Sequence, residues 1–159
     1  METKPAAGVS LIELIIVLLI LGLLVGLAFP TYQSHVVAAR RAQAQTALLT
    51  LANAMERHYA VSGSYLGAGS EPDAQGVANA VGGPTIFPAR VPSEGGPAWY
   101  RLRIVAADRH SYLLQAIPSD EGPQAGDGLL QLDHTGGRGW DRDGDGVIAA
   151  AEACWAPTC

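Results

Sequence analysis

The segment Gly8–Phe29, with the sequence GVSLIELIIVLLILGLLVGLAF, decides the architecture of this chain of 159 residues. From residue 9 to residue 29 it is almost wholly apolar. A helix of that length, rising about 1.5 Å per residue, can cross the hydrocarbon core of a bilayer. The run is too long for the apolar region of a secretory signal peptide. We therefore predict a transmembrane helix over residues 9–29, preceded by a short polar leader at residues 1–8.

Glu13 is the charged residue that interrupts this apolar run. A carboxylate inside a membrane helix costs roughly 2.5–3.5 kcal/mol on insertion scales, so such a residue usually has a function. The alternative is that Glu13 lies close enough to the helix end to reach the lipid headgroups. On the residues alone, both interpretations stay open.

The string Gly8-Val9-Ser10-Leu11-Ile12-Glu13 resembles the cleavage and methylation signature of type IV prepilins and type II secretion pseudopilins. The resemblance implies that a peptidase cuts between Gly8 and Val9, that the new N-terminal residue is methylated, and that Glu13 is needed for assembly. Val9 stands where the family usually has Phe or Met, and Ser10 where Thr is common. The resemblance further implies a single-pass protein of the bacterial inner membrane, with its head outside the cytoplasm and later in an extracellular pilus.

The same resemblance implies a set of partners. They are other pilin subunits, the prepilin peptidase/methyltransferase, the inner-membrane pilus assembly machinery and the membrane itself. A carboxylate buried between packed helices needs a cation, because an unpaired buried charge is costly. We therefore expect Glu13 to pair with the new amine at Val9 of a neighbouring subunit.

Residues 30–60 are predicted to form the amphipathic half of the same helix. Pro30 removes a backbone donor, and Gly22 and Gly26 weaken the helix before it, so we expect a kink or local unwinding around residues 22–30. Beyond this point, apolar residues recur at helical spacing and should pack on a sheet. They are Ala44, Leu48, Leu51, Met55 and Tyr59. Ser62-Gly63-Ser64 should end the helix.

Residues 61–159 are predicted to form a globular head. Residues 63–97, rich in Gly, Ala, Pro and Ser, are interpreted as an irregular connection. Strand patterns follow at residues 98–105, 111–118 and 128–133, and the short links between them favour an antiparallel meander. One helix on one antiparallel sheet is an α+β architecture, which is also the type IV pilin fold. The order Tyr-x-Leu, Tyr-x-Leu-x-Ala and Leu-x-Leu-Asp-x-x-Gly resembles minor pilins of the PilE kind.

Residues 141–152 match the register of an EF-hand calcium loop. Gly146 permits the sharp turn, and Ile148 should point inward. Hard oxygen ligands gathered round one point suit Ca²⁺ better than a softer metal, so we predict a structural calcium site. The predicted ligands are the side chains of Asp141, Asp143, Asp145 and Glu152 and the backbone carbonyl of Val147. The alternative is a solvated Asp/Gly turn.

The chain has two cysteines, Cys154 and Cys159, so one intramolecular disulfide is possible. Because the head is expected outside the cytoplasm, where disulfides persist, we predict that the two pair with each other; the alternative is two unpaired thiols. In many pilins a cysteine in the sheet pairs with one near Cys154. Here Asp127 lies about where that cysteine would be, and the calcium loop is expected to replace the missing disulfide.

The formal net charge of −5 argues against a general nucleic-acid binder, and no specific nucleic acid is predicted as a partner. The four histidines are scattered, without a Ser/His/Asp or HExxH arrangement, so we do not expect an enzyme. The leading hypothesis is a minor pilin of a type IV pilus serving motility, adhesion or DNA uptake. The alternatives are a type II secretion pseudopilin, a membrane-anchored calcium-binding module that does not polymerise, and a DNA receptor, which the acidic charge makes a weaker hypothesis.

Overall fold

The computed structural model describes residues 10–157, apart from the side chains of residues 25–31. One long helix, α1 (Leu11–Ser62), precedes a set of short strands. Contacts divide the chain into two units that meet between Val36 and Val37. The first unit consists of the beginning of α1, and the second contains the rest of the helix and the whole sheet.

In the first unit, the large apolar side chains from Leu11 to Leu24 are exposed, a pattern that marks surfaces for lipid or other proteins. Among the described residues, no helix is both long and apolar enough to cross a membrane. Val9 and the side chains of residues 25–29, which belong to the predicted membrane segment, lie outside the described residues. The backbone is α-helical throughout residues 22–30, so the predicted unwinding is wrong. Pro30 removes one helical hydrogen bond, and a single missing bond does not end a long helix.

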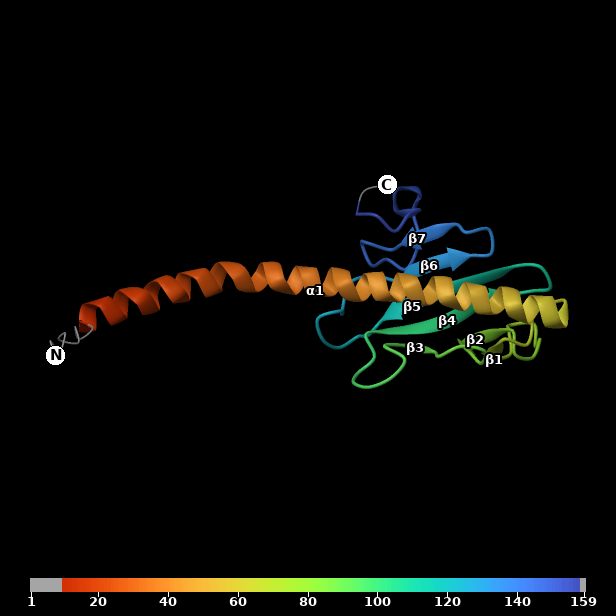
Figure 1. Ribbon diagram of the computed structural model, residues 1–159. Helices are drawn as coiled ribbons and strands as arrows, with labels where there is room; N and C mark the ends of the chain where they lie inside the picture. Colours follow the sequence, from red (N-terminus) through yellow and green to blue (C-terminus); the bar gives the residue numbers. More distant parts are fainter. Residues whose placement is uncertain (1–9, 158–159) are drawn as a thin grey trace. The chain divides into compact units, whose positions relative to one another are not determined.

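The second unit is a helix packed on an antiparallel sheet (Figure 1). In the described residues the sheet has seven strands in the order β1-β2-β4-β5-β6-β7, with β3 pairing on β4. The strands are β1 (Gly69–Glu71), β2 (Val81–Pro84), β3 (Arg90–Val91), β4 (Tyr100–Ala107), β5 (Tyr112–Pro118), β6 (Leu130–Asp133) and β7 (Arg138–Trp140), followed by the short 3₁₀ helix η1 (Ala150–Glu152). This arrangement confirms the predicted α+β fold.

The core lies between α1 and one face of the sheet. Ala44, Leu48, Leu51 and Met55 are buried, and Tyr59 packs against them, which confirms the predicted stripe. From the sheet, alternate residues of the central strands complete the core, because successive side chains of a strand point to opposite faces. They are Tyr100, Leu102 and Ile104 of β4, Tyr112, Leu114 and Ala116 of β5, and Leu130 and Leu132 of β6.

The end of the helix is also as expected. Gly63 follows Ser62 with a φ of +70°, a left-handed conformation that glycine adopts without strain. Tyr65 then folds back on the helix, where its hydroxyl donates to Glu56 Oε1 at 3.0 Å and its ring lies 4.7 Å from that of Tyr59. Burial, followed by the hydrogen bond to Glu56, raises the pKa of Tyr65 to about 12.

Four strands were not predicted. Strands β1, β2 and β3 lie inside residues 63–97, which the sequence suggested were irregular, and β7 lies between the last predicted strand and the acidic loop. At Gly69 a β-carbon would lie 2.3 Å from the carbonyl oxygen of Val81, so a glycine is what allows β1 and β2 to approach. A glycine-rich composition usually indicates a loop, but here a glycine allows two strands to pair closely.

Candidate functional sites in the head and along the helix

The processing residues Gly8 and Val9 lie outside the described residues. Glu13 lies in the first turn of α1 and is exposed. A carboxylate near a helix N-terminus interacts favourably with the helix dipole. Its predicted role in assembly depends on a neighbouring subunit and stays a prediction.

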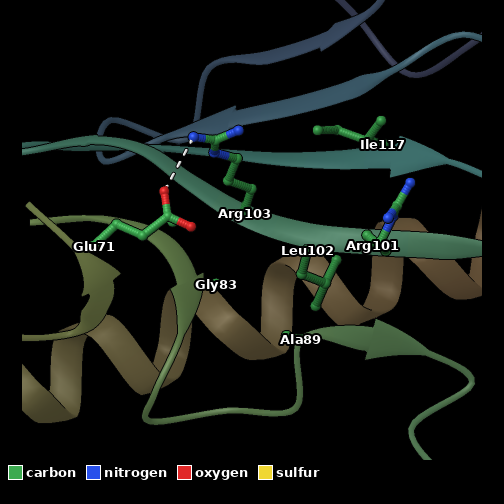
Figure 2. A pocket seen from close by; sticks show the side chains of 8 residues that line it. Glu71, Gly83, Ala89, Arg101, Leu102, Arg103 and Ile117 are labelled. Atoms are coloured by element: carbon green, nitrogen blue, oxygen red, sulfur yellow. Dashed lines mark ion pairs between the residues drawn. The ribbon is translucent and has the colours of Figure 1, made fainter. Parts of the chain in front are cut away.

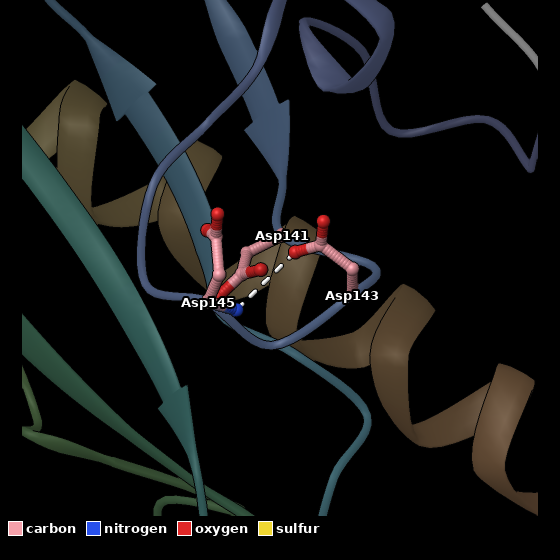
Figure 3. A group of neighbouring side chains, drawn as sticks. All are labelled: Asp141, Asp143 and Asp145. Carbon is pink, nitrogen blue, oxygen red and sulfur yellow. Dashed lines mark hydrogen bonds between the residues drawn. The ribbon is translucent and has the colours of Figure 1, made fainter.

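The acidic loop gathers three carboxylates predicted as calcium ligands. Asp141, Asp143 and Asp145 each offer an oxygen, and these oxygens lie within 4.8 Å of one another (Figure 3). Asp141 is buried, whereas Asp143 and Asp145 are exposed. The backbone holds the turn, since Asp141 Oδ1 accepts from Gly144 N at 2.8 Å and Oδ2 from Gly146 N at 3.0 Å. Carboxylates this close repel one another, and a bound cation would relieve that repulsion.

Glu152 closes the other end of the loop. Its side chain is buried and accepts from the backbone N–H of Arg142 at 2.7 Å and of Ala149 at 3.2 Å. The N–H of Arg142, followed by that of Ala149, lowers the pKa of Glu152, so the carboxylate form is favoured. Here Glu152 acts as a clasp that joins the start of the loop to η1.

Ile148 points inward, as the calcium-loop register requires. A β-carbon at Gly139 would lie 2.6 Å from Ile148 Cγ2, so this side chain packs directly on the backbone of β7. The side chain of Val147 is exposed, which leaves its backbone carbonyl as the group of interest. The donor set of acidic oxygens and a carbonyl fits a hard cation such as Ca²⁺.

Cys154 is disulfide-bonded. Cys159 lies outside the described residues, and its pairing with Cys154 stays a prediction. Nearby, Trp155 fixes the end of the chain to the sheet, because its ring N–H donates to the carbonyls of Gln131 and Gly139, each at 3.1 Å. The guanidinium of Arg138 lies 4.8 Å from the centre of the Trp155 ring.

Asp127 is the centre of a polar cluster that joins the helix to the sheet. Its side chain is 5% exposed and forms an ion pair with Arg41 of α1, which includes Arg41 Nε to Asp127 Oδ2 at 2.9 Å. Tyr100 donates to the same carboxylate through its hydroxyl, and Gln124 does so through Nε2 at 2.8 Å. Burial, followed by the hydrogen bond to Asp127, raises the pKa of Tyr100. From the sequence, Asp127 was noted only because it lies about where many pilins have a cysteine, and this polar cluster was not predicted.

Trp140 links that cluster to the acidic loop. Its ring N–H donates to the carbonyl of Asp127 at 2.7 Å, and the Arg41 guanidinium lies 3.7 Å from the centre of the ring. The next residue along the chain is Asp141, the first of the loop carboxylates. Gly128 permits this approach, because any β-carbon there would overlap the carbonyl oxygen of Asp141.

A pocket of about 320 Å³ lies where α1 meets the start of β4. Arg40 contributes its guanidinium, which stacks 4.6 Å from the centre of the Trp99 ring. Ser119, Glu121 and Gln124 line the same pocket. Sequence reasoning missed this pocket, because its residues are distant in the chain and follow no periodic pattern.

Comparison with known proteins gives two family matches. Residues 3–29 match the prokaryotic N-terminal methylation motif. Residues 30–128, more than half of the chain, match a family described as the type IV minor pilin ComP, DNA uptake sequence receptor. No curated protein matches the sequence. Among solved structures, the selenomethionine crystal structure of the non-core minor pilin PilV of Neisseria meningitidis is similar, with 16% identity and a TM-score of 0.47, covering 77% of this chain and 97% of that one.

Proposed function

This chain belongs to the family of the type IV minor pilin ComP, the DNA uptake sequence receptor, and we propose that its task in the pilus is to bind DNA for uptake. It is a minor pilin of a type IV pilus, with the N-terminal methylation motif of that class. The observation that carries the proposal is the match over residues 30–128. That match favours a pilus subunit over the secretion pseudopilin and over a calcium-binding module that does not polymerise.

The proposed route to the pilus follows from the N-terminal motif. We propose that a prepilin peptidase cuts after Gly8 and that residues 9–29 hold the subunit in the inner membrane with its head outside the cytoplasm. Glu13 then pairs with the amine at Val9 of the next subunit during assembly. The role is structural and ligand-binding rather than catalytic.

Processing and assembly are tested by intact mass measurement on sheared surface filaments and on the remaining envelope. We expect mature protein that begins at Val9, with a methylated N-terminus, in the sheared filaments. Mature protein confined to the envelope would contradict pilus assembly, and an uncut chain would contradict the proposed processing.

The acidic net charge of the chain is unevenly distributed along the sequence. Within residues 30–128, seven arginines and eight acidic residues nearly balance, and residues 129–159 carry five acidic residues against two arginines. The net charge therefore says little about the matched part, where local clusters of arginine decide phosphate binding. Arg90 of β3 and Arg101 of β4 are register partners, and Arg103 follows on the same face, so three guanidinium groups share one surface.

DNA binding is tested on the full chain in detergent and on the pilus in cells. We expect the purified protein to bind a labelled duplex with an affinity that falls as salt rises, because phosphate contacts release counterions. A strain without this subunit should keep its pili and lose DNA uptake. Undiminished uptake in that strain would refute the receptor role while leaving the pilin assignment intact.

We also propose that the loop at residues 141–152 binds Ca²⁺ through Asp141, Asp143, Asp145, the Val147 carbonyl and Glu152. The support is the convergence of the three aspartates within 4.8 Å. Glu152 lies outside that group and accepts from the N–H groups of Arg142 and Ala149, so it would have to exchange these hydrogen bonds for the ion. The loop lies beyond the residues matched by the minor pilin family, so this proposal rests on the loop itself. The ion would pin the C-terminal part of the head rather than serve a reaction.

Calcium binding is tested by thermal unfolding with excess calcium and with EDTA. Extracellular calcium modules bind with a Kd of roughly 10⁻⁴–10⁻³ M. Calcium at about 10 mM should then stabilise the head by about 1.4–2.7 kcal/mol. Asp145→Asn should abolish most of that gain, whereas Asp120→Asn, on an exposed residue outside the loop, should keep it. Equal stability in calcium and EDTA would refute the site.

A further inference from the structure

A groove lies on the sheet where two strands pair with the same edge of β4. Strand β2 pairs with β4 at Gly82 and Ile104, and β3 pairs with it further along, at Arg90 and Arg101. Residues 85–89, which connect β2 to β3, belong to neither strand. The two pairings therefore leave a gap opposite the middle of β4, and a groove of about 430 Å³ lies there (Figure 2).

Two guanidinium groups of β4 border this groove and are accessible to solvent. Arg101 and Arg103 alternate with Leu102, which is buried in the core under α1, so both arginines point to the opposite face. They follow each other along the strand at about 6.7 Å. Their side chains are 66% and 51% exposed, and Arg90, the exposed register partner of Arg101, lies beside them. The groove thus offers accessible donors to phosphate oxygens, which guanidinium groups bind in a bidentate manner.

An acidic side chain lies near each of the two arginines of β4. Arg103 Nη2 is 3.6 Å from Glu71 Oε2, and Arg101 Nη2 is 3.7 Å from Asp120 Oδ2. At these lengths neither pair is a hydrogen bond, and both carboxylates are exposed. Ion pairs of this kind contribute little free energy, so an anion with better geometry can take the place of either carboxylate.

The fold holds Glu71 in its position beside the groove. Gly82 has a φ of +91°, and a β-carbon there would lie 2.9 Å from Glu71 Cδ. The side chain of Glu71 therefore rests directly on the backbone of β2 and extends towards Arg103, as Figure 2 shows. This arrangement makes Glu71 an internal competitor for any phosphate that approaches Arg103.

The lining of the groove indicates which part of a DNA molecule it would contact. Apart from the arginines and Glu71, the described residues that line it are small or aliphatic, namely Gly82, Gly83, Ala89, Leu102 and Ile117. None of these lining residues carries an aromatic ring on which an unpaired base could stack. Arginine contacts to phosphate position a duplex without reading its sequence. The groove is therefore suited to the backbone of DNA and not to its bases.

We propose that this groove binds the phosphate backbone of duplex DNA through Arg101 and Arg103, and that Glu71 and Asp120 give up the two guanidinium groups when DNA binds. The inference rests on the proposed DNA-receptor function and adds the place of the backbone contact and the residues that restrain it. The contact does not depend on base sequence. The two carboxylates keep the affinity below the value that the arginines alone would give.

The test is fluorescence anisotropy of the full chain in detergent with two labelled duplexes of equal length and different sequence, titrated over a range of salt. Arg101→Gln and Arg103→Gln should each weaken binding about five- to tenfold at about 0.1 M salt. Each should also reduce the slope of log affinity against log salt by about 0.9, because one phosphate contact is lost. Both effects should be equal for the two sequences. Arg57→Gln, which removes the same charge from an exposed position on α1, is the control and should leave affinity and slope nearly unchanged.

The acidic partners provide a result in the opposite direction, which damage to the fold would not produce. Glu71→Gln and Asp120→Asn should each strengthen binding about two- to fivefold, since each frees a guanidinium from a weak exposed pair. Glu71→Gln made in the Arg103→Gln background should give a much smaller gain, because the carboxylate acts through that arginine.

The outcomes separate the groove from the receptor function. If the wild-type chain binds no duplex DNA, both are refuted. If it binds duplex DNA but Arg101→Gln and Arg103→Gln weaken binding no more than Arg57→Gln, the receptor function stands and the groove is refuted. If the arginine variants weaken binding but Glu71→Gln and Asp120→Asn do not strengthen it, the role assigned to the two carboxylates is refuted.

Discussion

Replacement of Asp127 by asparagine should loosen the head from its helix. The substitution keeps the shape of the side chain but removes its charge and one acceptor. Arg41, which is 17% exposed, then loses its counter-ion, and Tyr100 and Gln124 lose the oxygen to which both donate. These contacts join α1, β4 and the loop before β6, so the effect should appear as a loss of stability of the whole head.

The magnitude follows from the burial of the pair. Removal of one partner of a buried ion pair costs about 3–5 kcal/mol, because the other charge is left uncompensated. Arg41 is not fully buried. In the variant its guanidinium would still stack on the ring of Trp140, whose centre lies 3.7 Å from Arg41 Cζ, and this contact partly compensates the charge, so the lower end of that range applies. We expect a loss of about 3 kcal/mol, which lowers the melting temperature of a domain of this size by about 12 °C.

The assay is thermal unfolding of the full chain in detergent, followed by tryptophan fluorescence. All three tryptophans lie in the head, so the signal reports on that unit. The control is Asp120→Asn, the same substitution at a carboxylate that is 91% exposed and paired with Arg101 at 3.7 Å; it should stay within about 0.5 kcal/mol of the wild type. The double variant with Arg41→Gln should show a coupling energy of about 2 kcal/mol. Equal stabilities of Asp127→Asn and Asp120→Asn would refute the reasoning.

Three further predictions concern other parts of the chain. Glu13→Ala should leave cleavage after the leader intact but remove the subunit from sheared filaments; normal incorporation would contradict the pairing in assembly. Because the pKa of Tyr65 is raised to about 12, the folded state holds this proton while the unfolded state loses it near its ordinary value of about 10. The stability from Tyr65 is therefore present below about pH 10 and lost as pH rises towards 12, and Tyr65→Phe should flatten the fall of the urea midpoint over that window; parallel curves would contradict it. Cys154→Ser should cost about 2 kcal/mol if the bridge closes the short loop to Cys159, and intact mass after alkylation without reduction should show no modified thiol in the wild type.

Local pattern made much of the fold predictable. The apolar stripe on α1 could be predicted because Leu48, Leu51 and Met55 are spaced so that they share one face of a helix. All three are buried in the core. The strands β4, β5 and β6 could be predicted from alternation of apolar and other residues. In β4, for example, Leu102 and Ile104 alternate with arginine and valine. The register of the acidic loop could also be recognised from neighbouring residues, because its aspartates and glycine follow one another within a few positions.

What the sequence could not supply depends on contacts between distant residues. Strands β1 and β2 are short and glycine-rich, and only their close approach at Gly69 makes them strands. Gln124 and Asp127 lie outside the predicted strands, and their importance comes from burial against Arg41 and Tyr100. Net charge was equally uninformative about DNA, because it averages over the acidic loop and the arginines of the sheet.

The part of the chain beyond the matched residues is joined to the matched part by the pairing of β6 with β5 and by a chain of side-chain contacts around Trp140. Arg41 of α1 is paired with Asp127 and stacked on Trp140, and Trp140 immediately precedes the first carboxylate of the acidic loop. Movement of Asp141 on cation binding would therefore reach Trp140 and, through Arg41 stacked on its ring, the carboxylate of Asp127.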